Sequence, residues 1–273
     1  MHFSLRSKAL VIYRKYIVAL EYIVVLEYLV VLEYLVVLEI LVTLENLVAL
    51  EILNRKLKKN TTMDSQKKVF ASKLLKVKAI KLQPENPFTW ASGWKSPFYC
   101  DNRKTLSYPD LRNYVKLELV HAVLENFPEA EAVAGVATGA IAQGALVADE
   151  LNLPFVYVRS KPKDHGLENL IEGELKPGMK VVVIEDLIST GGSSLKAVEA
   201  IRKNCCEVIG MVASYTYGFD IAKKAFEDAK VKLVTLTDYE HVVAEAHEIG
   251  YIKPEDVEVL HEWRKDPANW MKE

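Results

Sequence analysis

From Ala132 onward, short apolar runs alternate with longer stretches in which apolar residues recur every three or four positions. Short unbroken apolar runs are typical of strands buried on both faces, and the wider spacing is typical of helices with one buried face. The pattern predicts strands at residues 132–137, 154–159, 180–186, 208–217 and 231–237, with helices at 138–151, 193–204 and 221–229. Helices between consecutive strands predict an α/β fold, with a central parallel sheet flanked by helices.

Two further helices are predicted before the first of these strands. Residues 111–127 form one of them, opened by Tyr108-Pro109-Asp110. The other covers residues 66–82, where an apolar face is predicted from Val69, Phe70, Leu74, Leu75 and Ala79. Between the two helices lies a loop rich in proline, glycine and aromatic residues, at 84–103.

The beginning of the chain repeats with a period of six instead. Glutamate stands at every sixth position from Glu21 to Glu51, with mainly Leu, Val and Ile between. This period matches no coiled coil, and on a helix it spreads the glutamates over several stripes instead of one face. A membrane span is disfavoured as well, since every window long enough to cross holds several glutamates, each costing roughly 2–3 kcal/mol near the bilayer centre.

The composition of an ordinary domain begins at Met63, after the stretch NRKLKKNTT. A perfect six-residue repeat is what a tandem repeat of six codons would encode. We therefore expect residues 1–62 to be an N-terminal extension outside the native fold and residues 63–273 to be the functional domain. Within that domain we expect a small N-terminal part at about 63–110 and a core at about 111–273.

Composition and charge exclude several kinds of function. The formal net charge of −2 lacks the cationic excess of a dedicated nucleic-acid-binding protein, so we expect neither nucleic acid nor a membrane as partner. The spacing of Cys100, Cys205 and Cys206 matches neither a disulfide framework nor a zinc site. This pattern favours a location in the reducing cytoplasm. An anionic substrate must therefore be held by a local cluster of cations.

The strongest chemical signal follows the apolar run at 181–184. Glu185 and Asp186 precede the glycine- and hydroxyl-rich stretch LISTGGSS at 187–194, where a helix is predicted to begin. Inward-pointing N–H groups, hydroxyls and the positive end of a helix together form a cradle for phosphate. The two carboxylates would repel phosphate but suit sugar hydroxyls or a magnesium ion. Neither a P-loop nor a dinucleotide-binding pattern is present, so the stretch indicates a ribose 5-phosphate site.

A second polar segment, RSKPKDHG at 159–166, gathers positive charge in a long loop between two predicted strands. Charged loops are often only solvated surface, but long loops inside compact domains often act as lids over active sites. Because this is the dense positive cluster attached to the predicted sheet edge, we expect it to bind a diphosphate. We call residues 159–166 the lid segment.

Together these features resemble the orotate phosphoribosyltransferases. Residues 181–194 resemble the signature of type I phosphoribosyltransferases, the pattern R-x-x-x-K-x-H-G in the lid segment resembles the mobile catalytic loop of the orotate enzymes, and FTWASGWKSPFYCDNR at 88–103 resembles the hood that closes over orotate. The resemblance covers essentially all of residues 63–273 and implies the type I phosphoribosyltransferase fold with a small N-terminal hood. We call residues 88–103 the hood segment.

The resemblance also implies a reaction. Ribose 5-phosphate would be transferred from phosphoribosyl diphosphate to orotate, giving orotidine 5′-monophosphate and diphosphate in de novo pyrimidine biosynthesis. It implies Mg²⁺ as cofactor, held mainly by the substrate with Asp186 as a further ligand. It implies a homodimer too, in which the lid segment covers the partner's site.

Individual residues receive roles from the same resemblance. Arg159, Lys163 and His165 would bind the diphosphate, with Lys163 as the catalytic lysine, and Glu185 and Asp186 would hold the ribose hydroxyls, Asp186 also acting in catalysis. Lys95 would lie near orotate or the diphosphate, and residues 135–139 match the position of the family's diphosphate-side loop. The 5-phosphate would be held by Leu187, Ile188, Ser189, Thr190, Gly191, Gly192 and Ser193, of which Ser189 also touches orotate.

Departures from the family pattern concern the orotate carboxylate. Ala91 stands where some members carry lysine, Ser160 where many carry a second lid cation, and 214–219 contains no arginine where some members place one on orotate. Lys95 or backbone N–H groups remain as candidates to neutralise the carboxylate. Two other functions stay open: a purine phosphoribosyltransferase, which the hood segment disfavours, and a non-catalytic regulator that binds nucleic acid, which Lys163 and His165 disfavour.

Overall fold

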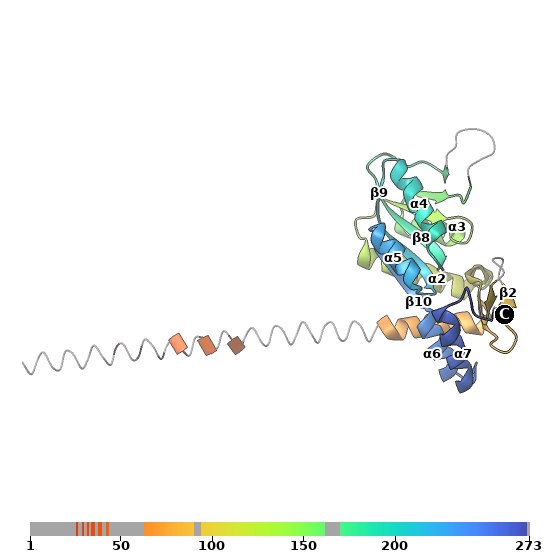
Figure 1. Cartoon of the computed structure of the whole chain (residues 1–273). Coiled ribbons are helices and arrows are strands. Elements are labelled where there is room, and N and C mark those ends of the chain that lie inside the picture. Colours follow the sequence, from red (N-terminus) through yellow and green to blue (C-terminus); the bar gives the residue numbers. More distant parts are fainter. Residues whose placement is uncertain are drawn as a thin grey trace, which may run out of the picture. The chain divides into compact units, whose positions relative to one another are not determined.

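The computed structural model describes residues 63–89, 94–161 and 170–271, together with nine residues between Leu26 and Thr43 (Figure 1). Contacts divide the chain into two units, Met1–Thr62 and Met63–Glu273. The nine described residues of the first unit are helical and exposed. Within the described parts of the chain, no helix is both long and apolar enough to cross a lipid bilayer. That residues 1–62 lie outside the native fold stays a prediction.

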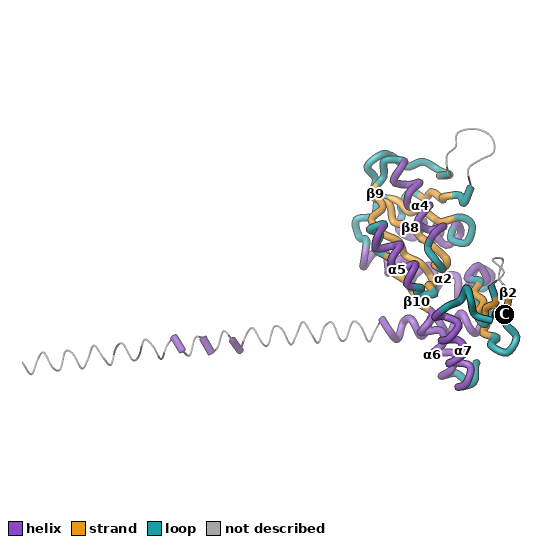
Figure 2. The backbone as a smooth tube through the Cα atoms, viewed as in Figure 1, coloured by secondary structure: helices purple, strands orange, loops and turns teal. Residues whose placement is uncertain are grey.

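The second unit is built around a six-stranded sheet with the strand order β10-β9-β8-β5-β6-β7 (Figure 2). In chain order its elements are a helix at 63–76, β1 Ile80–Leu82, β2 Phe88–Thr89, β3 Lys95–Ser96, β4 Phe98–Cys100, the 3₁₀ helix η1 Asn102–Ser107, α2 Pro109–Asn126, β5 Ala132–Val136, α3 Ile141–Leu151, β6 Phe155–Val158, β7 Ile171–Glu172, β8 Lys180–Ile188, α4 Gly192–Lys203, β9 Glu207–Thr216, α5 Asp220–Asp228, β10 Leu233–Asp238, α6 Tyr239–Glu248 and α7 Pro254–Lys265.

The predicted parallel sheet is confirmed for its main part. The strands β10, β9, β8, β5 and β6 pair in parallel, and only the edge strand β7 runs antiparallel to its neighbour β6. Sequence reasoning missed β7 because two residues in a polar segment form no apolar run. It also ended β8 too early: pairing with β9 continues through Leu187 and Ile188, the first two residues of the stretch at 187–194.

Both faces of the sheet are covered, as its apolar strands predict. Successive side chains of a strand point to opposite faces, and β8 shows this plainly. Val182 and Ile184 pack with residues of α2 and α3, whereas Val181 and Val183 pack with residues of α4 and α5. All four side chains are fully buried. This burial on both faces fixes the position of β8, and with it the carboxyl end of the strand.

The first helix of this unit ends before the predicted limit of 82. It runs over residues 63–76, after which Lys78 takes φ 54° and its N–H bonds back to the carbonyl of Leu75. A left-handed residue of this kind ends a helix, and residues 80–82 form β1 instead. Val69 was predicted on the apolar face but is 49% exposed, because the buried stripe follows Phe70 and Leu74.

Aromatic rings anchor the hood segment to the C-terminal part of the domain. Phe98 of β4 is fully buried, and its ring centroid lies 5.1 Å from that of Tyr239 and 5.2 Å from that of Tyr217. Trp263 of α7 stacks parallel to Phe98 and donates its indole N–H to the carbonyl of Lys95 at 3.2 Å. The hood segment is therefore held by residues far from it in sequence.

Candidate active site

The paired acids lie at the carboxyl end of β8, where parallel sheets bind ligands. Glu185 is buried, and both of its oxygens are engaged: Oε2 accepts from the Ser194 hydroxyl at 2.8 Å and Oε1 from the Asp186 backbone N–H at 2.9 Å. Burial, and next the charge of Asp186, raise the pKa of Glu185 well above its ordinary value. Glu185 therefore ties the strand to the first turn of α4, and its burial makes it easier to protonate than a free glutamate.

Asp186 is less buried and faces the turn that follows β5. A β-carbon placed on Gly139 would lie 2.0 Å from Asp186 Oδ2, so only glycine leaves room for the carboxylate at this approach. On the other side, the Asn102 side chain donates to the Asp186 carbonyl at 2.6 Å, which joins the start of η1 to the end of β8. Three separate parts of the chain thus meet at Asp186.

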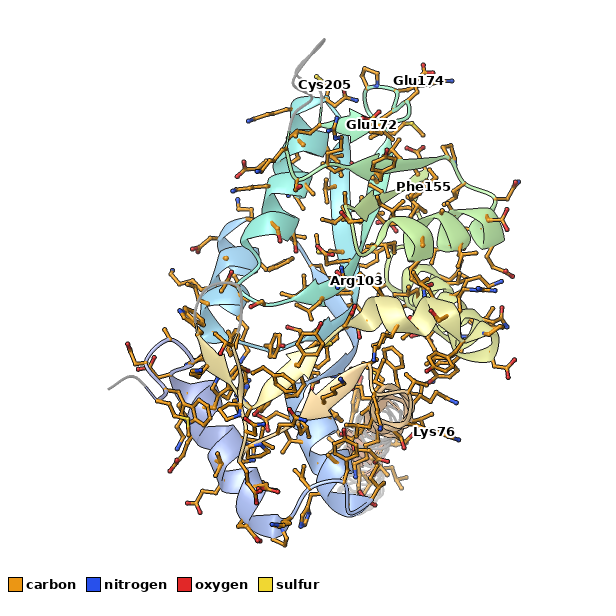
Figure 3. The ribbon with its side chains drawn as sticks, turned by 90° about the vertical axis from the view of Figure 1, so that its right-hand side faces the viewer. Lys76, Arg103, Phe155, Glu172, Glu174 and Cys205 are labelled. Atoms are coloured by element: carbon orange, nitrogen blue, oxygen red, sulfur yellow. The ribbon has the colours of Figure 1, made fainter. Side chains whose placement is uncertain are left out.

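A cavity of about 400 Å³ opens at this meeting point. It is lined from the sheet by β8 and the turn after β5, from the hood side by β4 and η1, and from the start of α4. The lining residues are Cys100, Asp101, Arg103, Val136, Ala137, Thr138, Gly139, Glu185, Asp186, Leu187 and Ser193. Figure 3 shows Arg103 on the hood side of the sheet, at the end away from Cys205.

The glycine-rich stretch forms the N-terminus of α4, as predicted. Gly191 takes φ 82° as the residue before the helix, a conformation that favours glycine. Leu187 and Ser193 line the cavity beside the acids. Ile188 is fully buried in the core, so any contact that it makes with a ligand must come from its backbone.

Thr190 lines a second cavity, of about 460 Å³. Trp94 of the hood segment and Arg264 of α7 line it too. Arg264 donates to the carbonyl of Tyr217 at 3.1 Å and to that of Gly218 at 2.9 Å. A guanidinium group thus reaches the 214–219 segment, which has no arginine of its own.

The predicted cations of the lid segment are only partly within the described residues. Arg159 follows β6 and pairs with Glu172 Oε1 at 3.4 Å, and it does not line the cavity beside the acids. Lys163 and His165 lie outside the described residues.

Lys95 lies on the β2–β3 hairpin of the hood segment. Its ammonium group donates to the Thr89 hydroxyl at 2.9 Å, and its side chain lines neither cavity among the described residues. The structure thus does not bring Lys95 to the paired acids.

Two cations in the walls of these two cavities, Arg103 and Arg264, were not singled out from the sequence. Arg103 is the last residue of the hood segment, and its position after a motif-bearing stretch was the signal that could have found it. Arg264 carried no such signal, because only folding brings α7 to the end of β9.

Cys100 also lines the cavity beside the acids. Burial, and then the charges of Asp186 and Asp101, raise the pKa of its thiol well above the ordinary value. The thiol therefore stays protonated at neutral pH, and its Sγ lies 3.4 Å from Asn102 Oδ1. A neutral thiol is a poor nucleophile, so Cys100 acts here as part of the wall.

The donor set of this cavity suits magnesium held largely by a substrate. Among the described residues, no three acidic, histidine or cysteine side chains converge into a protein-built metal site. Asp186 and Asp101 are hard oxygen donors on the cavity wall. Magnesium in phosphate-binding sites usually keeps one or two carboxylates besides phosphate and water oxygens, which this arrangement can supply.

Comparison with known proteins adds independent findings. The family model of the phosphoribosyl transferase domain matches residues 121–248. A protein of Phocaeicola vulgatus named orotate phosphoribosyltransferase is 76% identical over 208 residues, which are 76% of this chain and 98% of the relative. Its namesake in Bacteroides fragilis is 74% identical over the same length and shares. The crystal structure of orotate phosphoribosyltransferase from Aeropyrum pernix is 28% identical at a TM-score of 0.59, covering 67% of this chain and 99% of that one.

Proposed function

Because this chain belongs to the orotate phosphoribosyltransferase family, we propose roles in that enzyme's reaction for the residues around the cavity. The chain has the type I phosphoribosyltransferase fold. It transfers ribose 5-phosphate from phosphoribosyl diphosphate to orotate in pyrimidine biosynthesis, giving orotidine 5′-monophosphate and diphosphate. The observation that carries the proposed roles is that Glu185, Asp186 and the N-terminus of α4 line one cavity.

Asp186 is the ribose-binding carboxylate in this proposal. Its side chain lines the cavity, whereas both oxygens of Glu185 already accept hydrogen bonds from the protein. An ionised carboxylate only accepts hydrogen bonds, and the ribose hydroxyls can donate them. Glu185 then contributes mainly by fixing Asp186 and Ser194 relative to one another, and the backbone of 187–193 receives the 5-phosphate at the helix N-terminus.

The difficult step is cleavage of the bond between the anomeric carbon and the diphosphate oxygen. Positive charge develops on the sugar ring and negative charge on the leaving diphosphate, while the orotate nitrogen forms the new bond. Groups that stabilise the growing negative charge more than the ground state accelerate this step. Arg159, Lys163 and His165 are the proposed groups of the lid segment, with Lys163 as the catalytic lysine. Asp186 would be the protein ligand of a magnesium ion carried by the substrate, and that ion would supply further charge neutralisation.

The lid segment has a second task, which is to exclude water. A sugar with positive charge on its anomeric carbon is hydrolysed by water, so closure over the bound substrates protects the transfer. We propose that the enzyme is a homodimer in which this segment covers the partner's site. We also propose a cytoplasmic location, which Cys100, Cys205 and Cys206 support as free thiols.

The proposed roles are tested by Lys163→Ala, with Lys161→Ala in the same segment as the matched control. Loss of orotate absorbance, coupled to a decarboxylase, is followed with and without magnesium. Removing one electrostatic donor should lower kcat by roughly 10²–10³-fold in Lys163→Ala and only slightly in the control. A near-normal kcat in Lys163→Ala would remove this lysine from the mechanism, and turnover of guanine or xanthine in place of orotate would contradict the base specificity.

A further inference from the structure

Arg103 is an exposed cation built into the wall of the active-site cavity. It lies on η1, directly after the hood segment's last strand (Figure 3). It lines the cavity together with Glu185 and Asp186. Its side chain is 60% exposed. Among the described residues that line this cavity, Arg103 is the only one with a positive charge, whereas three carry carboxyl groups.

Asp101 holds Arg103 in place. The Arg103 Nε–H donates to Asp101 Oδ1 at 2.7 Å. This bond uses one edge of the guanidinium and leaves the two terminal nitrogens, which carry four further N–H donors, for another partner. Since Asn102, between these two residues, is bonded to the Asp186 carbonyl, the pair is fixed relative to the end of β8. The guanidinium is therefore positioned by its neighbours before any ligand arrives.

The turn after β5 also belongs to the cavity wall. Its residues Ala137–Gly139 line the cavity and lead into α3. This turn contains no cation. A substrate with a phosphate at one end and a diphosphate at the other needs two anion-binding places, and the α4 terminus serves only one of them.

We propose that Arg103 binds the diphosphate of phosphoribosyl diphosphate and of the released product. The proposal rests on the assignment of Asp186 to the ribose. An arginine fork matches the paired oxygens of a diphosphate. The orotate carboxylate is the other anion near the ribose, but the neighbouring cavity with Trp94 and Thr190 has cations of its own in Arg264 and Lys265.

Two ligands distinguish a role of Arg103 at the diphosphate from a role at the orotate carboxylate. Diphosphate carries no ribose and no carboxylate, whereas orotidine 5′-monophosphate carries both and no diphosphate. Arg103→Ala should raise the inhibition constant of magnesium diphosphate and the KM of phosphoribosyl diphosphate about tenfold, the effect of losing one charged hydrogen bond. The dissociation constant of orotidine 5′-monophosphate should stay unchanged. Arg112→Ala is the matched control, an exposed arginine on α2 that bonds to the Leu106 carbonyl outside the cavity.

Arg103→Gln, which keeps most of the side-chain length, is measured beside the alanine variant and should give the same separation even if the alanine variant is unstable. Arg103→Lys should recover only part of the diphosphate affinity, because a lysine lacks the fork. Unchanged diphosphate inhibition in both uncharged variants would overturn the proposal, and so would a selective loss of orotidine 5′-monophosphate binding, which would place Arg103 at the carboxylate. The unaltered enzyme's turnover of orotate tests the proposed function separately, since that function can hold while Arg103 has no part in it.

Discussion

Gly139→Ala tests whether the turn after β5 is shaped around Asp186. A β-carbon at this position would lie 2.0 Å from Asp186 Oδ2 and 2.3 Å from its Cγ, whereas ordinary van der Waals contact begins at 3.4 Å. Gly139 does not have a positive φ, so an alanine causes no backbone strain of its own. The carboxylate is the end of a short side chain and must therefore give way.

The size of the effect follows from this distance. Restoring contact requires the carboxylate to retreat by more than about 1 Å, and a displacement of that size in a catalytic site can cost about 10²-fold in rate. Stability should change little, since no core side chain is displaced. We expect a loss of about 1 kcal/mol or less, which lowers the thermal midpoint by only about 3 °C for a domain of this size.

The assay measures kcat/KM for phosphoribosyl diphosphate at saturating orotate, with thermal denaturation in parallel. Asp186→Ala and the double variant complete a cycle. If Gly139→Ala acts by displacing the Asp186 carboxylate, the double variant should be no slower than Asp186→Ala alone. Losses that add up in the double variant, or a wild-type kcat/KM in Gly139→Ala, would refute the reasoning.

Three further predictions concern stability and the extent of the domain. The raised pKa of Glu185 means that the folded state holds its proton more tightly than the unfolded state, so the stability from this carboxyl is complete below the ordinary glutamate pKa and is lost as pH rises through the raised value. Glu185→Gln should therefore flatten the decline of the free energy of unfolding with pH, measured by urea denaturation from acidic to neutral pH. Phe98→Ala should lower that free energy by about 3–5 kcal/mol, because it opens a cavity among fully buried rings. A chain that begins at Met63 should keep the kcat and thermal midpoint of the full chain, because 208 residues already cover 98% of a relative.

Each of these has a control and a contrary outcome. Ser194→Ala removes the hydrogen bond to Glu185 but keeps the carboxyl, so it should keep the pH-dependent decline that Glu185→Gln loses. Phe98→Leu should lose much less stability than Phe98→Ala, and equal losses would argue against a packing effect. Inactivity of the shortened chain, or an intact mass of 30.8 kDa for the native protein, would show that residues 1–62 belong to it.

Helices and strands with a strong hydrophobic pattern were predictable from the sequence, and the errors at their ends have local causes. The strand at 180–186 was evident because four consecutive β-branched or aliphatic residues precede Glu185, yet its true end at Ile188 depends on pairing with β9. The helix predicted to reach residue 82 ends at 76, because the left-handed turn at Lys78 leaves no apolar signal. Among the candidate site residues, the paired acids and Ser193 do share a cavity, whereas Lys95 and Arg159 bond elsewhere.

By itself, the sequence determined the α/β class, the glycine-rich stretch at the start of a helix and the paired acids before it, because each depends on the order of neighbouring residues. Periodicity, glycine placement and adjacent charges act over a few positions and are therefore visible along the chain. Only the tertiary structure decided that Gly139 must lack a side chain, that Arg103 shares a wall with Asp186 and that Arg264 reaches the end of β9. These contacts join segments from separate parts of the chain, and only packing against the sheet brings such segments within bonding distance.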